Sequence, residues 1–137
     1  MRVTIPVSAG ELIDRITILR IKSARIGDAK KQRAVRTDLA QLTAVRRCFP
    51  KLQRKGIRPL ERQLQATNLV LWETEDRLRV LESAANFGAE FVKLARRVYV
   101  TNDERARLKR EIDTLVDSEV REEKWFSPPK SPKRKPN

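Results

Sequence analysis

The feature that most constrains this chain is a regular spacing of positions in its middle third. Eight positions, six of them apolar, recur there at alternating intervals of four and three residues: Leu60, Leu64, Thr67, Leu71, Thr74, Leu78, Leu81 and Ala85. This period places them on one face of an α-helix. Pro59 precedes the run, in the first helical turn, where a helix tolerates proline. The spacing therefore predicts one long helix over residues 60–85 with coiled-coil-like packing.

The N-terminal residues predict a short extended segment followed by a helix. Residues 2–7 alternate β-branched and polar side chains, which favours extended backbone. Ser8 and Glu11 then match a capping box, in which both side chains satisfy the first N–H groups of a helix. A one-sided apolar stripe at helical spacing follows: Leu12, Ile16, Leu19 and Ile26. We therefore predict a helix that begins at Ala9.

A second helical stretch is predicted over residues 29–47. Its apolar positions lie on the face opposite to a continuation of the first stripe: Val35, Leu39 and Leu42. We therefore favour a break at Gly27, although a different helical phase through Ala24 leaves one continuous helix as the alternative. Cys48 to Pro59 contains two prolines and four basic residues, and it predicts a basic loop.

The C-terminal half predicts two further helices. Residues 86–88 interrupt the long helix, and the apolar spacing from Phe91 to Val98 predicts a short one. Residues 101–104 match a second capping box, which predicts a new helix start before Leu108 and Ile112. Residues 127–137 hold four prolines, four basic residues and no acid. We expect this tail to be disordered, because it has too little apolar surface to bury.

Together these elements predict an all-α protein. We expect a single helical domain over residues 1–126, built as an antiparallel helical bundle with one long central helix, followed by the basic, proline-rich tail. An elongated bundle of 137 residues leaves apolar surface uncovered. We therefore expect a second copy of the chain to cover this surface, so that two copies form a homodimer.

Composition excludes several classes of function. The chain has no histidine and one cysteine, so it lacks the commonest general acid or base and offers no zinc-binding cluster. Its four glycines are isolated, and none forms a phosphate-binding loop. We expect neither catalysis nor a cofactor. No signal peptide or membrane-spanning run is apparent, so we expect a cytoplasmic protein.

The charge is distributed unevenly. The formal net charge of +13 divides into +11 for residues 1–58, −2 for residues 59–126 and +4 for residues 127–137. Ten basic residues form the densest part, and they are candidates for a polyanion-binding patch: Lys30, Lys31, Arg33, Arg36, Arg46, Arg47, Lys51, Arg54, Lys55 and Arg58. The alternatives are that they pair with the acid-rich half of the bundle or form a solvated face. Nothing in this region predicts recognition of bases, so nucleic-acid binding would be non-specific.

A polar stripe runs beside the apolar face of the long helix. Its members repeat the same spacing one residue out of step: Asn68, Trp72, Glu75, Arg79 and Glu82. Arg79 is three or four residues from Glu75, Asp76 and Glu82, so a surface ion-pair ladder is one interpretation. The other is a contact with a partner, in which Trp72 is a buried anchor and Arg79 presents a fixed guanidinium.

Three segments resemble a family of small bacterial proteins of unknown function. They are residues 5–19, 68–79 and 94–106, and the ending from Ser118 to Trp125 is similar too. In that family the domain occurs alone or beside glycosyltransferase-like and cell-envelope polysaccharide genes. The resemblance implies no activity or cofactor. It singles out polar positions that a minimal bundle does not require, among them Asp14, Arg96 and Arg105.

The sequence thus leads to two functional hypotheses. The first is a non-catalytic helical interaction or scaffold protein, accessory to cell-surface polysaccharide biosynthesis, with a glycosyltransferase-type protein as its partner. Its predicted partner surface comprises six residues: Asn68, Trp72, Glu75, Arg79, Arg96 and Tyr99. The alternative is non-specific binding of nucleic acid or another polyanion through residues 30–58 and the C-terminal tail.

Overall fold

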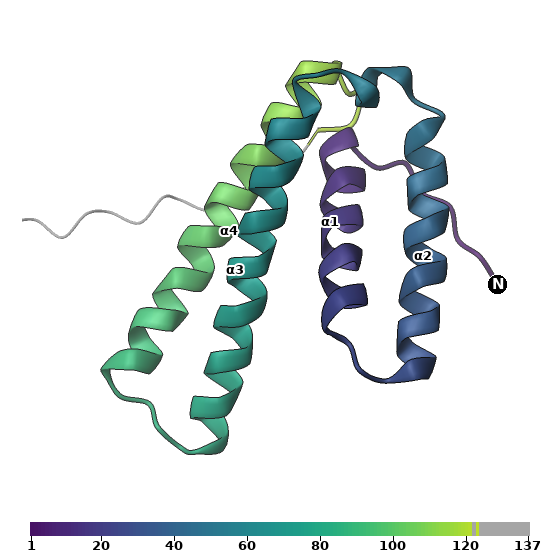
Figure 1. Ribbon diagram of the computed structural model, residues 1–137. Helices are drawn as coiled ribbons and strands as arrows, with labels where there is room; N and C mark the ends of the chain where they lie inside the picture. The colour runs from purple at the N-terminus through teal and green to yellow at the C-terminus, as the bar shows by residue number, and fades with distance from the viewer. Residues whose placement is uncertain (122, 124–137) are drawn as a thin grey trace, which may run out of the picture.

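A computed structural model describes residues 1–121 and residue 123, and in this part every regular element is helical. The elements are α1 (Ala9–Arg25), α2 (Ala29–Arg47), the short 3₁₀ helix η1 (Pro50–Gln53), α3 (Ile57–Ser83) and α4 (Ala89–Val116). Two antiparallel hairpins, α1–α2 and α3–α4, meet at one end and diverge at the other (Figure 1). The predicted all-α helical bundle is confirmed, and the predicted tail lies outside the described residues.

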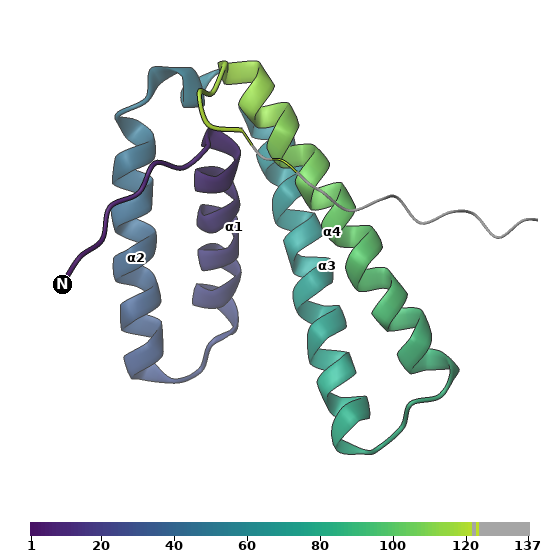
Figure 2. The ribbon, with the colours of Figure 1, turned by 180° about the vertical axis from the view of Figure 1, so that it is seen from behind.

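The start of α1 and the break after it follow the sequence prediction. Ser8 has extended backbone, and its side chain accepts a hydrogen bond from the N–H of Glu11 at the first turn of α1. Asp28 caps α2 in the same way by accepting from the N–H of Lys31. Gly27 lies between the two helices, so the alternative of one continuous helix is wrong. Residues 1–7, predicted to be extended, form neither helix nor strand and pass beside α2 (Figures 1 and 2).

The predicted helix start at residues 101–104 is wrong, because α4 continues through it from Ala89 to Val116. The physical reason is an uninterrupted three-four spacing toward α3, which a break would destroy: Phe91, Leu94, Val98, Thr101, Arg105, Leu108 and Ile112. The protein therefore has two long helices, whereas the sequence predicted one. α3 has 27 residues and α4 has 28, each about 40 Å long.

The predicted loop before α3 is shorter and more ordered than the sequence suggested. It contains η1, whose Leu52 is buried, and α3 begins at Ile57. Pro59 is thus the third residue of the helix and still within its first turn. Leu52 anchors the connection between the two hairpins.

The hydrophobic core lies at the closed end of the molecule, where the two hairpins meet. It consists of Leu12, Ile13, Ile16, Leu52, Ile57, Leu64, Leu108, Ile112 and Val116. α2 contributes no fully buried residue and packs on α1 through the half-buried Leu39 and Leu42. In the diverging half of the α3–α4 hairpin only Thr74 and Leu81 are buried. That half therefore rests on a single seam between two helices.

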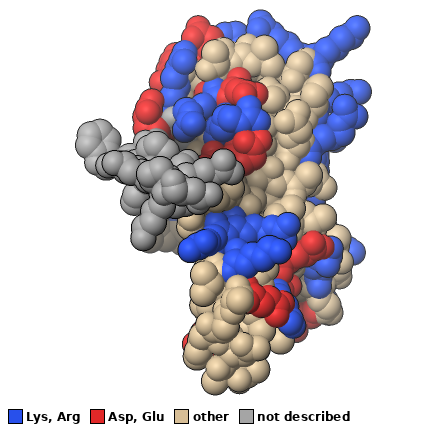
Figure 3. Space-filling view, turned by 90° about the vertical axis from the view of Figure 1, so that its left-hand side faces the viewer, with Lys and Arg blue, Asp and Glu red and all other residues tan. Residues whose placement is uncertain are grey.

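The surface of the α3–α4 hairpin carries both signs of charge. Figure 3 shows one face of the molecule: acidic and basic side chains are mixed over its upper part, a group of basic side chains lies below them, and the lowest part is mostly uncharged. None of the described helices has an apolar stretch long enough to cross a bilayer.

Candidate functional site

The first turn of α1 is seated directly on α4. The N–H of Gly10 donates to a carboxylate oxygen of Asp113 at 2.6 Å, and the N–H of Ala9 donates to the hydroxyl of Ser118 at 3.2 Å. The backbones approach so closely that a Cβ at position 10 would collide with the carbonyl of Lys109. Asp113 also places negative charge at the positive end of the α1 dipole. Glycine is therefore required here by contact with the main chain of α4.

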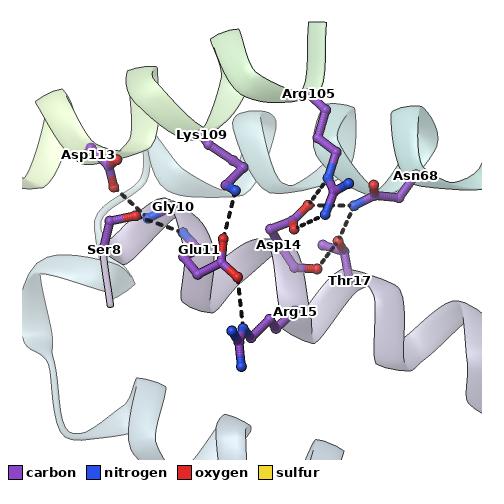
Figure 4. Close-up of polar contacts among 10 residues, drawn as sticks. All are labelled: Ser8, Gly10, Glu11, Asp14, Arg15, Thr17, Asn68, Arg105, Lys109 and Asp113. Atoms are coloured by element: carbon purple, nitrogen blue, oxygen red, sulfur yellow. Dashed lines mark hydrogen bonds and ion pairs between the residues drawn. The ribbon is translucent and has the colours of Figure 1, made fainter. Parts of the chain in front are cut away.

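A buried carboxylate joins α1 to both long helices (Figure 4). Asp14 is completely buried, and Arg105 of α4 donates to its two oxygens at 2.9 and 2.5 Å. Asn68 of α3 donates to Asp14 at 2.9 Å and to the hydroxyl of Thr17 at 2.9 Å. Thr17 in turn donates to the carbonyl of Asp14. We call Asp14, Thr17, Asn68 and Arg105 the three-helix clamp.

Glu11 forms a second bridge between α1 and α4. Its carboxylate accepts from Lys109 at 2.7 Å and from Arg15 at 2.8 Å. Burial alone would raise the pKa of Glu11, but the hydrogen bonds from Lys109 and Arg15 outweigh it and lower the pKa below its ordinary value. The capping-box glutamate thus connects two helices in addition to marking a helix start.

Beside the clamp lies an open groove of about 510 Å³ where α1 and α3 diverge. Ile18 and Ile21 of α1 and Leu71 of α3 form its apolar part. Its polar lining contains one indole, one amide, two guanidinium groups and two carboxylates: Trp72, Asn68, Arg79, Arg105, Glu75 and Asp76. Apolar surface bordered by both signs of charge is suited to binding a complementary surface. We call this feature the clamp groove.

The structure brings together four of the six residues predicted as a partner surface. Asn68, Trp72, Glu75 and Arg79 line the clamp groove. Asn68 is buried and belongs to the clamp, so it positions the groove from within. The other two, Arg96 and Tyr99, are exposed on α4 and are not among the groove-lining residues.

The predicted ion-pair ladder on α3 is not formed. Among residues 1–121, no ion pair within 4.0 Å joins Arg79 to Glu75, Asp76 or Glu82. Arg79 thus retains its hydrogen-bond donors on the groove side of the helix.

The ten residues of the predicted polyanion patch divide into two groups. Arg46 is largely buried and donates to Glu61 of α3 at 2.7 Å, and Arg54 donates to the carbonyl of Leu115 at 3.3 Å. The remaining eight are exposed, and none makes an ion pair with another described residue: Lys30, Lys31, Arg33, Arg36, Arg47, Lys51, Lys55 and Arg58. For these eight, pairing with the acid-rich half of the described chain is excluded.

Glu61 is shared by two arginines. Arg20 of α1 donates to the same oxygen as Arg46, at 2.6 Å. Burial would raise the pKa of Glu61, but the hydrogen bonds from Arg46 and Arg20 outweigh it and lower the pKa below 4.5. We call Glu61, Arg20 and Arg46 the Glu61 cluster. Its two guanidinium groups and one carboxylate leave one excess positive charge.

Several residues of the clamp, and of the α1–α4 contacts beside it, were not predicted as functional from the sequence. Asp14 and Arg105 were singled out only by the resemblance, and Lys109 and Asp113 were not singled out at all. The available signal was charge at positions facing the apolar interior of α1 and α4. In the part of the chain that the structure describes, no three acidic or cysteine side chains lie close enough to hold a metal ion.

One protein family matches nearly the whole chain. A model for a family of unknown function, DUF6165, matches residues 1–136. The chain belongs to this family. No curated protein and no solved structure matches it. The expected membership in a family of unknown function is thus confirmed, and the family supplies no activity for the clamp groove.

We predict that the clamp is a major source of stability. Asp14→Ala removes the buried acceptor to which both Asn68 and Arg105 donate, which should lower the free energy of unfolding by about 3 kcal/mol. Glu73→Ala is the matched control, because it also removes a carboxylate that pairs with an arginine across two helices, but the pair of Glu73 with Arg25 is exposed. The control should cost less than about 1 kcal/mol. Urea unfolding followed by circular dichroism measures both, and equal losses would contradict the prediction.

We predict a loss of stability in acid that depends on Glu61. Because its folded pKa is lowered, the stabilisation is complete above the unfolded value of 4.5 and is lost as the pH falls through the folded pKa. Glu61→Gln should therefore reduce stability at pH 7 and weaken its dependence on pH below about 5. Glu119→Gln, at an exposed site, should leave that dependence unchanged. Thermal melts across this pH range give the answer, and identical profiles for both variants would refute the assignment.

Proposed function

We propose that this protein is a non-catalytic helical interaction module that binds a helical segment of a partner protein in the clamp groove. The observation that carries the proposal is the convergence of Trp72, Arg79 and the carboxylates of Glu75 and Asp76 on one open, partly apolar groove. Tryptophan and arginine are the residue types that most often dominate the binding energy of protein interfaces.

The shape and chemistry of the groove favour a helix as the occupant. Two diverging helices leave a channel into which an amphipathic helix places its apolar side. Ile18, Ile21 and Leu71 would contact that side, while Arg79 and the acidic pair Glu75 and Asp76 would face charged residues flanking it. The partner segment we propose therefore has an apolar stripe bordered by both acidic and basic residues.

The proposal extends to the setting in which the module acts. Its support is the family resemblance, which implies that such domains occur alone or beside glycosyltransferase-like and cell-envelope polysaccharide genes. We propose a glycosyltransferase-type protein as the partner and the bacterial cytoplasm as the compartment. In this role the protein is a scaffold accessory to cell-surface polysaccharide biosynthesis.

We predict that Trp72→Ala combined with Arg79→Ala abolishes partner binding while the helical circular dichroism signal is retained. The variant removes the aromatic anchor and the guanidinium from the groove. Phe49→Ala combined with Arg62→Ala is the matched control, since it removes an exposed aromatic and an exposed guanidinium that do not line the groove. Affinity purification with mass spectrometry compares the two with the wild type.

A partner retained by the control and lost by the groove variant supports the proposal. This partner is then purified and titrated against the wild type, the control variant and the groove variant. We expect its affinity to fall at least tenfold for the groove variant alone. Equal recovery by all three proteins would overturn the assignment of the clamp groove.

The homodimer expected from the sequence is a separate part of the proposal. Its support is the apolar surface of the α3–α4 hairpin, where Val80, Phe87 and Val100 are each more than half exposed. We predict that light scattering after size exclusion gives about twice the chain mass of 15.9 kDa. Val80→Lys combined with Val100→Lys should yield monomers. A wild-type mass of one chain would contradict the dimer.

A further inference from the structure

The strongest charge feature outside the clamp groove is the arginine flank of α2. Arg36 and Arg47 are eleven residues apart, about three helical turns, so they lie on the same side of the helix. Arg33 lies one turn before Arg36. All three are exposed, and none pairs with an acid among the described residues. Over 14 residues this flank presents three guanidinium groups along about 21 Å.

The Glu61 cluster fixes the orientation of this flank. Arg46, which precedes Arg47 in the helix, points inward and is held by Glu61 and by the carbonyl of Leu52. Arg20 reaches the same carboxylate from α1 and is about one-third exposed. The cluster has two guanidinium groups for one carboxylate, so its excess positive charge adds to the electrostatic potential of the flank. Exposed Lys51, Lys55 and Arg58 continue it past the end of α2.

The side chains between the arginines are small. Ala40 and Ala44 occupy the flank between Arg36 and Arg47, at spacings of four, four and three residues, and both are exposed. A bulky ligand backbone can thus approach the helix without obstruction. Between Arg33 and Arg47 this side of the helix offers no large apolar side chain for insertion into a lipid bilayer and no aromatic ring for stacking an unpaired base. The exposed Phe49 follows α2, in the connection to α3.

We propose that the arginine flank of α2 binds the phosphate backbone of duplex nucleic acid, independently of the clamp groove, and that the adjoining Glu61 cluster contributes its excess of positive charge to the attraction. Guanidinium groups match phosphate oxygens in two-pronged hydrogen bonds. Phosphates of one strand are spaced about 3.4 Å apart along the duplex axis. A row of arginines about 21 Å long therefore spans about six base-pair steps. Recognition is of the backbone alone and is insensitive to base sequence.

The distribution of charge orients the complex. Residues 1–58 carry a formal +11, whereas residues 59–126 carry −2. The surface of the α3–α4 hairpin mixes acidic with basic side chains (Figure 3). A duplex is therefore attracted to the α1–α2 side and leaves the clamp groove, which α3 shares with α1, open to a protein partner.

The test compares two triple variants with the same change in net charge. One replaces the flank, Arg33→Gln with Arg36→Gln and Arg47→Gln. The other replaces three exposed cations of α4, Lys93→Gln with Arg96→Gln and Arg97→Gln. Binding to a fluorescent DNA duplex of about 20 base pairs is measured by anisotropy across a range of salt concentrations, after circular dichroism has shown that both variants are helical.

We expect the flank variant to bind at least tenfold more weakly at 50 mM salt, and the slope of log affinity against log salt to fall by about 2.7, or 0.9 for each lost phosphate contact. The α4 variant should stay within about threefold of the wild type, as should a duplex of scrambled sequence. If both variants weakened duplex binding equally, binding would depend on net charge alone, and the assignment to the arginine flank would be wrong. If the protein did not bind the duplex at 50 mM salt, or bound phosphatidylserine vesicles instead, duplex nucleic acid would be the wrong ligand.

Discussion

The contact on which the rest of the structure depends is the attachment of α1 to α4 and α3 through buried polar groups. Asp14 is inaccessible to water and is held by a two-pronged arginine, while Gly10 allows the first turn of α1 to touch the main chain of α4. A carboxylate in such a place is tolerated only when its partners are fixed. The clamp therefore specifies how the two hairpins meet, beyond what apolar packing alone would define.

This attachment at one end explains why the hairpins are apart at the other. The core lies where α1 begins and α4 ends, the clamp lies next to it at Asp14 and Arg105, and α1 has 17 residues against 27 for α3. Past the clamp, α1 and α3 diverge and leave the groove lined by Trp72 and Arg79. The same buried network thus stabilises the fold and shapes the surface proposed to bind a partner. The arginine flank, on a helix without buried residues, is structurally separate from it.

Local patterns predicted most of the helices, because caps and apolar periodicity act within a few residues. Ser8 and Gly27 mark real boundaries, and the seam from Leu60 to Leu81 belongs to one helix. The prediction of a new helix start at residues 101–104 is wrong because contacts between helices decided the outcome there. A capping motif is only a local preference, and there the continuous packing of α4 on α3 outweighed it. Of the six residues of the predicted partner surface, four line the clamp groove because they share one side of α3, whereas Arg96 and Tyr99 belong to α4.

The sequence alone determined an all-α chain with its charge concentrated in the first 58 residues, because composition and periodicity are properties of the chain itself. Only the tertiary structure decided what the polar residues do. Asn68 looked like part of an exposed stripe and lies buried against Asp14, while Glu11 looked like a cap and also bridges to Lys109. These pairs are separated by 54 and 98 residues. Contacts over such distances depend on how the helices pack, which no local pattern encodes.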